Sequence, residues 1–244
     1  MATLIARLVN RLLLNSSRIY LERYNRGFAR SMKTGARMLD AGAGNAPYKM
    51  LFQHVEYESA DFEQVDKPYA KSTYVCDLCE RIPVEDGRFD YIVFNQTMEH
   101  LRDPGKALSE LFRVLAPGGR IICTVPLFYE EHEQPFDFFR YTQFAHRYLF
   151  TQAGFEVERI EWLEGFFGTC GYMFQVMFRY LPAKLPGAFP TAFLATPFLV
   201  IVRTFSLFAA AVFYRLDLHC KVMQLGFPKN YVIFARKPDG QTVL

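Results

Sequence analysis

The stretch Met38-Leu39-Asp40-Ala41-Gly42-Ala43-Gly44-Asn45 is a short apolar segment that runs into a carboxylate and a glycine-rich turn. Glycine tolerates positive φ and lets a ligand approach the backbone. A turn of this kind after the first strand of a parallel sheet lies where α/β folds bind their ligands. The stretch therefore predicts a Rossmann-like domain with a nucleotide-like ligand, and taken alone it also suits a nicotinamide dinucleotide.

Two residues at this turn help to distinguish the cofactor classes. A dinucleotide fingerprint needs a third glycine and free N–H groups where this chain has Pro47, and proline has no N–H. Asp40 would also lie near two phosphates, which is a repulsive contact. A sulfonium amino acid instead carries a cationic amine that a carboxylate attracts. The turn therefore favours S-adenosylmethionine over a dinucleotide.

Strands and helices alternate outward from this turn, which is typical of a mostly parallel sheet. We expect strands at 37–41, 57–60, 72–76, 89–95, 120–125, 155–162 and 231–236. We expect helices at 47–52, 104–115, 144–153 and 166–181, with one or two more at 191–216, and Pro117-Gly118-Gly119 should end the second of them. The predicted fold is α/β and Rossmann-like, a seven-stranded, mostly parallel sheet with helices on both faces and an apolar helical insertion between the last two strands.

Polar residues follow the next three expected strands. Asp61 lies about twenty residues past the glycine turn, where a carboxylate can accept both ribose hydroxyls. Asp77 could accept from an adenine amino group while Leu78 packs on the ring. Asn95 and Gln96 follow the fourth strand, and we expect them to face the activated methyl group.

Six motifs stand in one order along residues 35–163: LDAGAGNAPY (39–48), ESADF (58–62), VCDL (75–78), FDYIVFNQTMEHLRDP (89–104), LFRVLAPGGRIICTVP (111–126) and AGFEV (153–157). With them the chain resembles class I, type 11-like S-adenosylmethionine-dependent methyltransferases, a group that includes quinone-biosynthesis and surface-polysaccharide-cluster enzymes. The resemblance implies an enzyme whose cofactor is lined by Asp40, Gly42, Gly44, Asp61, Asp77, Leu78 and Asn95. The predicted cofactor-binding set also includes Ala41, Asn45, Phe62 and Gln96. It departs at Ala46, where many members carry glycine, and this puts the cofactor affinity in question.

The segment PLFYEEHEQPFDFFRYT (126–142) follows the fifth strand and should border the acceptor. A hydroxyl acceptor benefits from a general base, and His132 suits this role because imidazole titrates near neutrality. Glu131 and His100 are rival candidates, and His132 could equally be a loop histidine tied to its neighbours. The candidate substrate-binding residues are Tyr129, Asp137, Arg140 and Tyr141. Arg140 could pair with an acidic acceptor or simply with Asp137.

The five cysteines are odd in number and irregular in spacing, so we expect free thiols in a reducing cytoplasm. Cys76 and Cys79 have the C-x-x-C form, but no second pair or histidine cluster along the sequence completes a zinc site. The sequence therefore predicts no metal site.

Two uncharged stretches, 186–202 and 204–214, stand between the last two strands. Each falls at or below the ~17–25 residues that a transmembrane helix needs, and Pro190, Pro197 and Arg203 interrupt them. We favour an interfacial helical lid on the inner face of the cytoplasmic membrane. A re-entrant hairpin is the second interpretation, and a dimer interface or substrate cap is the third. Residues 3–14 predict an amphipathic helix within a basic segment, so membrane contact is expected through 1–30 and 186–216.

The sequence thus divides into basic N-terminal helices (1–34), a cofactor-binding core (35–165), an apolar insertion (166–227) and a final strand with a tail (228–244). The leading hypothesis is methyl transfer to a small or lipid-linked, apolar acceptor, such as a quinone precursor, a polyprenyl-linked sugar or another lipid. The alternatives are other chemistry on a lipid or quinone, or a non-catalytic subunit that binds the cofactor. Nucleic acid is disfavoured because no aromatic and basic groove is evident, and a homodimer stays open.

Overall fold

The computed structural model describes residues 16–182 and 191–240, and for residues 191–195 it describes the backbone alone. The predicted N-terminal helix at 3–14 lies outside the described residues. The chain forms two compact units, and each is described by itself below. The sheet unit comprises residues 21–163 and 230–244, and the helical unit comprises residues 1–20 and 164–229.

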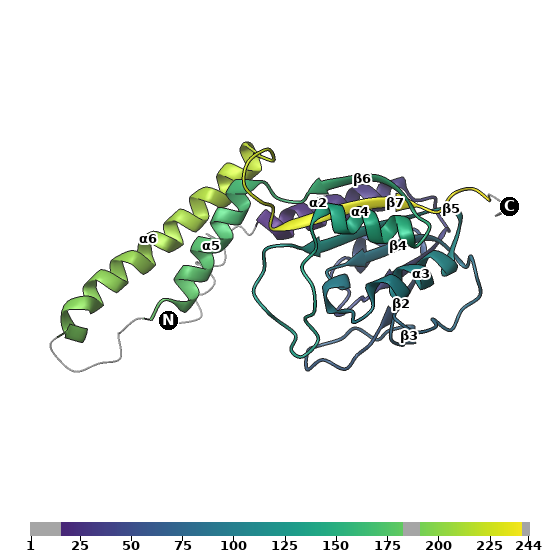
Figure 1. Ribbon diagram of the computed structural model, residues 1–244, viewed down its shortest axis with the longest axis horizontal. Helices are drawn as coiled ribbons and strands as arrows, with labels where there is room; N and C mark the ends of the chain where they lie inside the picture. The colour runs from purple at the N-terminus through teal and green to yellow at the C-terminus, as the bar shows by residue number, and fades with distance from the viewer. Residues whose placement is uncertain (1–15, 183–190, 241–244) are drawn as a thin grey trace. The chain divides into compact units, whose positions relative to one another are not determined.

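A seven-stranded sheet with the order β3-β2-β1-β4-β5-β7-β6 forms the centre of the sheet unit (Figure 1). Its strands are β1 (Arg37–Ala41), β2 (Glu56–Asp61), β3 (Tyr74–Val75), β4 (Phe89–Asn95), β5 (Leu115–Pro126), β6 (Glu156–Trp162) and β7 (Asn230–Arg236). The pairs from β3 to β5 are parallel, whereas β7 is antiparallel to β5 and β6. This arrangement confirms the predicted Rossmann-like fold.

Helices cover both faces of this sheet. Successive strand residues point to opposite faces, so the strands present side chains to the helices on either side. The α-helices of the sheet unit are α2 (Ser16–Ser31, whose first turn belongs to the helical unit), α3 (Pro104–Val114) and α4 (Gln143–Gln152). On one face Phe28 of α2 makes edge-on ring contacts with Tyr91 and Phe234. The neighbouring residues Ile92 and Ile233 belong to the buried core on the other face, where α3 and α4 lie (Figure 1).

Two predicted elements differ from those observed. The helix expected at 47–52 is only a 3-10 turn, η1 (Lys49–Phe52). The helix expected to end at Pro117-Gly118-Gly119 ends at Val114, and β5 begins at the next residue. The pairing of β4 with β5 is irregular between Phe89 and Tyr91, and Gly118 adopts a positive φ of 73°. The three residues therefore form an irregular start to the strand instead of a loop.

The helical unit contains a hairpin of α5 (Phe166–Tyr180) and α6 (Thr191–His219), so the last insertion helix is single and unbroken. Glycines on α5 allow the two helices to pack closely. A Cβ added at Gly168 would lie 2.6 Å from an Asp217 carboxylate oxygen, and one added at Gly171 would lie 2.8 Å from the Tyr214 ring. The chain leaves the sheet at Trp162 and re-enters it at Asn230, which confirms an apolar helical insertion between the last two strands.

Candidate functional site

A cavity of about 370 Å³ opens where β1, β2, β3 and β4 end. Because these strands are parallel, their carboxyl ends meet at one edge of the sheet. The predicted site residues that line the cavity are Gly42, Asp61, Phe62, Asp77, Leu78, Gln96 and His100. The structure thus brings together residues that are more than fifty positions apart in the chain.

The cavity offers carboxylate oxygens from two neighbouring strand ends. Asp61 accepts the Gly44 N–H at 2.7 Å and the Glu63 N–H at 3.0 Å, and Asp77 accepts the Cys79 N–H at 2.8 Å. These bonds fix the carboxylates and leave lone pairs for a ligand. Neither carboxylate makes an ion pair with a residue that the structure describes. Such a lining suits ribose hydroxyls and an amino group, and it would repel a pyrophosphate.

Five other predicted cofactor residues do not line the cavity. Asp40 and Ala41 are buried in β1, Asn45 is exposed, and Gly44 contributes its N–H to Asp61. The Asn95 amide donates to Asn25 at 2.8 Å and accepts the Thr124 hydroxyl at 2.8 Å. None of these five residues lines the cavity. Their proposed contact with a cofactor therefore stays a prediction.

Asp40 has an altered acidity. Burial, with a smaller contribution from Asp61, raises the pKa of Asp40 to about 6, although a 2.6 Å hydrogen bond from the Tyr57 hydroxyl opposes the shift. The buried carboxylate lacks a described cation to stabilise its charged form. A cationic amine nearby would supply that charge.

Besides the predicted Phe62, the loop after β2 contributes cavity residues that the sequence did not reveal. Lys67 forms a 2.6 Å ion pair with Glu133, which belongs to the loop after β5. Phe62 and Phe136 meet edge to face, with ring centroids 5.6 Å apart. Both pairs connect the two loops across the cavity. No local sequence pattern predicts these two contacts, because each pair joins residues more than sixty positions apart.

Most of the predicted acceptor-binding residues hold the loop after β5 in place. Arg140 donates to both Asp137 carboxylate oxygens, at 2.6 and 2.8 Å, and to the Glu130 carbonyl. Burial alone would raise the pKa of Asp137, but the bonds from Arg140 and the His132 N–H lower that pKa to about 2. Tyr141 is buried and donates to the Met98 carbonyl at 3.3 Å. Tyr129 is 37% exposed, and none of the predicted four lines the cavity.

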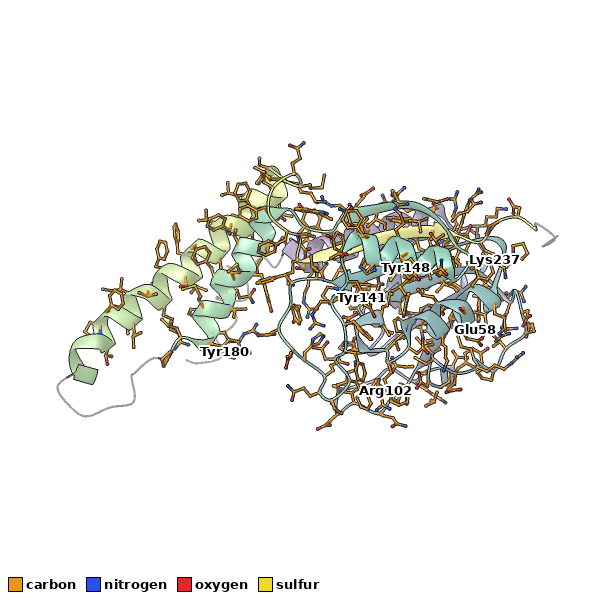
Figure 2. All side chains as sticks on the ribbon, in the orientation of Figure 1. Glu58, Arg102, Tyr141, Tyr148, Tyr180 and Lys237 are labelled. Carbon is orange, nitrogen blue, oxygen red and sulfur yellow. The ribbon has the colours of Figure 1, made fainter. Side chains whose placement is uncertain are left out.

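The three predicted general bases occupy different environments. His100 lines the cavity beside Arg102, which Figure 2 labels. His132 lies outside the cavity lining, with its ring centroid 4.6 Å from that of His100, and Glu131 is exposed. Glu99, which follows the fourth strand and stands next to His100, is wholly buried. Burial raises the pKa of Glu99 to about 8 and lowers the pKa of His100.

A family model described as a methyltransferase domain matches residues 1–160. The chain belongs to this family. The membership confirms the predicted enzyme class, the S-adenosylmethionine-dependent methyltransferases, and its cofactor. The residues described above fit that cofactor, since Asp61 and Asp77 present free acceptor positions at the strand ends and Gly42 brings the backbone to the cavity.

A curated relative of this methyltransferase is the demethylmenaquinone methyltransferase of Staphylococcus haemolyticus. The two chains are 28% identical over 152 residues, which is 54% of this chain and 61% of the relative. Across the first three curated relatives the matched share of their length is 45% to 61%. The chain thus spans about half the length of the curated relatives it matches.

Solved structures share the fold of this methyltransferase. The [4+2]-cyclase SpnF has a TM-score of 0.57 and 18% identity, covering 90% of this chain and 81% of SpnF. A phosphoethanolamine N-methyltransferase from Haemonchus contortus, in complex with S-adenosyl-L-methionine, has a TM-score of 0.51 and 20% identity, covering 92% and 53% of the two chains. At these identities the likeness concerns the fold alone.

Ala46 offers a test of the one departure from the family pattern. Its φ of 50° lies in the left-handed region, which costs a non-glycine residue about 1–2 kcal/mol. We expect Ala46→Gly to raise the free energy of unfolding by about 0.5 kcal/mol, because the greater freedom of glycine in the unfolded chain offsets part of the relief. Urea titration of both proteins measures the change. A loss of stability would show that residue 46 is not strained.

Proposed function

We propose that this methyltransferase acts at a membrane surface and transfers the methyl group of S-adenosylmethionine to an apolar acceptor that dissolves in lipid. One observation carries the membrane part of this proposal. Large apolar side chains of α6 are exposed at intervals of three and four residues, and we name them the apolar stripe: Phe198, Ile201, Phe205, Phe208, Val212 and Leu216. Such intervals place the side chains along one face of the helix.

The opposite side of α6 is buried. Ser206, Ala210 and Tyr214 are buried, and Gly171 of α5 packs against Tyr214. The residues of the apolar stripe stay 37% to 69% exposed, although the Phe205 ring also meets that of Phe174 of α5 edge on. A stripe from 198 to 216 extends over roughly 27 Å of helix, and so long an apolar surface is typical of contact with a membrane or a partner.

A lipid surface fits this stripe better than a transmembrane path. Thr196–His219 is long and apolar enough to cross a membrane, with a mean hydropathy of 1.8. Trp162 pairs with Tyr231 in the sheet, so a chain that crossed once would have to cross back. The returning helix would be α5, whose 15 residues extend about 22 Å, whereas the hydrocarbon core measures about 30 Å. We therefore infer that α6 lies in the interface of the cytoplasmic membrane, on its inner face.

The acceptor follows from this location and from the relatives. A quinone precursor with a prenyl tail dissolves in the bilayer, and the relative from Staphylococcus haemolyticus is named a demethylmenaquinone methyltransferase. We infer that the acceptor approaches the cavity on the side of His100, Arg102 and Phe136. Methyl transfer is an in-line displacement, so the main task of these residues is to hold the acceptor at a reactive distance.

The deciding experiment incubates the full chain with S-adenosylmethionine labelled in its methyl group and with a membrane-lipid extract. We expect label in a lipid identified by mass spectrometry, and one S-adenosylhomocysteine released for each methyl transferred. Conversion of a lipid without release of the thioether would instead favour other chemistry with the same cofactor. Binding of the cofactor with no converted lipid would favour a non-catalytic subunit.

A further inference from the structure

Glu99, His100 and His132 form a cluster at the edge of the cavity. One ligand atom from each residue lies within 4.8 Å of the others. Glu99 is wholly buried, and neither of its carboxylate oxygens has a hydrogen-bond partner in the part of the chain that the structure describes. A buried carboxyl group without a partner is costly, so native proteins nearly always provide one. Glu99 therefore has a buried carboxylate oxygen to offer to a ligand at this cluster.

Both histidines are held in the same way. Nδ1 of His100 lies 2.7 Å from the Phe136 carbonyl oxygen, and Nδ1 of His132 lies 3.1 Å from the Glu130 carbonyl oxygen. A carbonyl oxygen can only accept, so each Nδ1 carries a hydrogen, and in the neutral ring Nε2 then offers its lone pair. A hydrogen bond from one ring nitrogen to a carbonyl is the usual way in which proteins orient a metal-binding histidine.

We propose that Glu99, His100 and His132 bind one divalent transition-metal ion. Two imidazole nitrogens and a carboxylate oxygen suit zinc and its neighbours, whereas magnesium and calcium prefer oxygen alone. Glu99 Oε1 and His100 Nε2 are 3.7 Å apart, close to the spacing of about 3.4 Å for two ligands at ~2.1 Å from one tetrahedral ion. His132 stands on the loop after β5, and its ligand atom lies within 4.8 Å of those of Glu99 and His100.

The role of the ion rests on the proposed function, because His100 lines the cavity. Three protein ligands leave a position for a hydroxyl oxygen of the acceptor. An ion that holds this hydroxyl lowers its pKa, and the proton passes to water. The resulting oxygen anion, or the ring carbon it activates, attacks the methyl group, the bond from methyl carbon to sulfur breaks, and neutral S-adenosylhomocysteine leaves. Where carbon attacks, that carbon then loses its proton to water and the oxygen regains one, which restores the ring.

The binding test needs no acceptor. The full chain is freed of metal with a chelator and titrated with Co²⁺, whose visible spectrum reports nitrogen and oxygen ligands. We expect one ion for each chain and a dissociation constant at least about 10-fold larger for Glu99→Gln and for His132→Gln, since loss of a ligand costs more than loss of the groups that orient it. His219→Gln removes an exposed histidine of α6 and should bind Co²⁺ as the unaltered chain does.

The outcomes separate the metal site from the proposed function. The site would be overturned if the unaltered chain failed to bind Co²⁺, or if both cluster variants bound Co²⁺ as tightly as the unaltered chain. If Glu99→Gln does not fold, His132→Gln decides alone, because this side chain is 27% exposed on a loop. Label transfer that is lost on metal removal and restored by Zn²⁺ supports the role of the ion, and full transfer without metal overturns that role. Stoichiometric binding without transfer to any lipid would leave the site standing and contradict the proposed function.

Discussion

Replacement of Gly42 by alanine should abolish measurable binding of S-adenosylhomocysteine. Gly42 adopts a φ of 72°, and a Cβ there would lie 2.2 Å from Thr97 Oγ1 and 2.7 Å from Thr97 Cβ. Thr97 has little freedom to move, because its hydroxyl donates to the Asn95 carbonyl at 2.9 Å. Strain of about 1–2 kcal/mol from the backbone adds to this clash. We expect affinity to fall by more than about 100-fold, which corresponds to about 2.7 kcal/mol.

Gly44→Ala is the matched control for this change. Gly44 also has a positive φ, of 54°, but a Cβ at this position meets nothing within 4 Å. It therefore carries the backbone cost alone, and we expect a loss of about 10-fold. Calorimetric titration of the three proteins with S-adenosylhomocysteine measures the difference, and thermal unfolding checks that each is folded. Equal losses for the two variants would show that contact with Thr97 is not what requires glycine at position 42.

The second large effect concerns the apolar stripe. Ile201, Phe205 and Phe208 are 66%, 60% and 69% exposed. Transfer of each such side chain from water into an apolar phase is worth about 1.5–3 kcal/mol when complete. Even if each side chain gains only half of this free energy on the membrane, serine at all three positions should weaken the binding of anionic phospholipid vesicles by at least about 50-fold. Co-sedimentation with the vesicles measures the change.

The control removes apolar surface from the sheet unit. Phe144 and Tyr148 of α4 are 76% and 64% exposed, so a double serine variant loses comparable surface away from the apolar stripe (Figure 2 labels Tyr148). This variant should bind vesicles as the unaltered chain does. Equal losses for both variants would contradict the role of the stripe. If the stripe instead covers a second copy of the chain, its variant should turn a dimer into a monomer in light scattering while vesicle binding stays the same.

Local patterns were sufficient for most of the fold. The seven strands were predictable because each is a short run of apolar or alternating residues between turns. The residues that follow β1, β2 and β3 were predictable because parallel strands end at one edge. The start of β5 was missed, since Pro117-Gly118-Gly119 looks like a loop until its pairing with β4 is known. Helix α6 was expected as one or two helices because Pro197 lies within it.

The parts of the site that the sequence could not show depend on contacts between distant segments. Lys67 and Glu133 carry no local signal for their ion pair, and His132 stands 32 residues after His100. The absence of a histidine pattern along the chain led to the expectation of no metal site, but His100 and His132 meet through the fold of the loop after β5. The sequence also left open whether Arg140 pairs with an acidic acceptor or with Asp137. Its bidentate bond to Asp137 is visible only in the folded loop.

The segment of the helical unit that contains α5 and α6 begins and ends at paired positions of the sheet. Trp162 lies opposite Tyr231, and the Leu163 N–H donates to the Asn230 carbonyl at 2.9 Å, as at the closed end of a β-hairpin. Everything between these residues is topologically a long hairpin loop. Evolution could therefore lengthen, exchange or delete this segment without disturbing the strand register that supports the cofactor cavity. The place where such an enzyme works in the cell and the chemistry it performs would then be free to diverge separately.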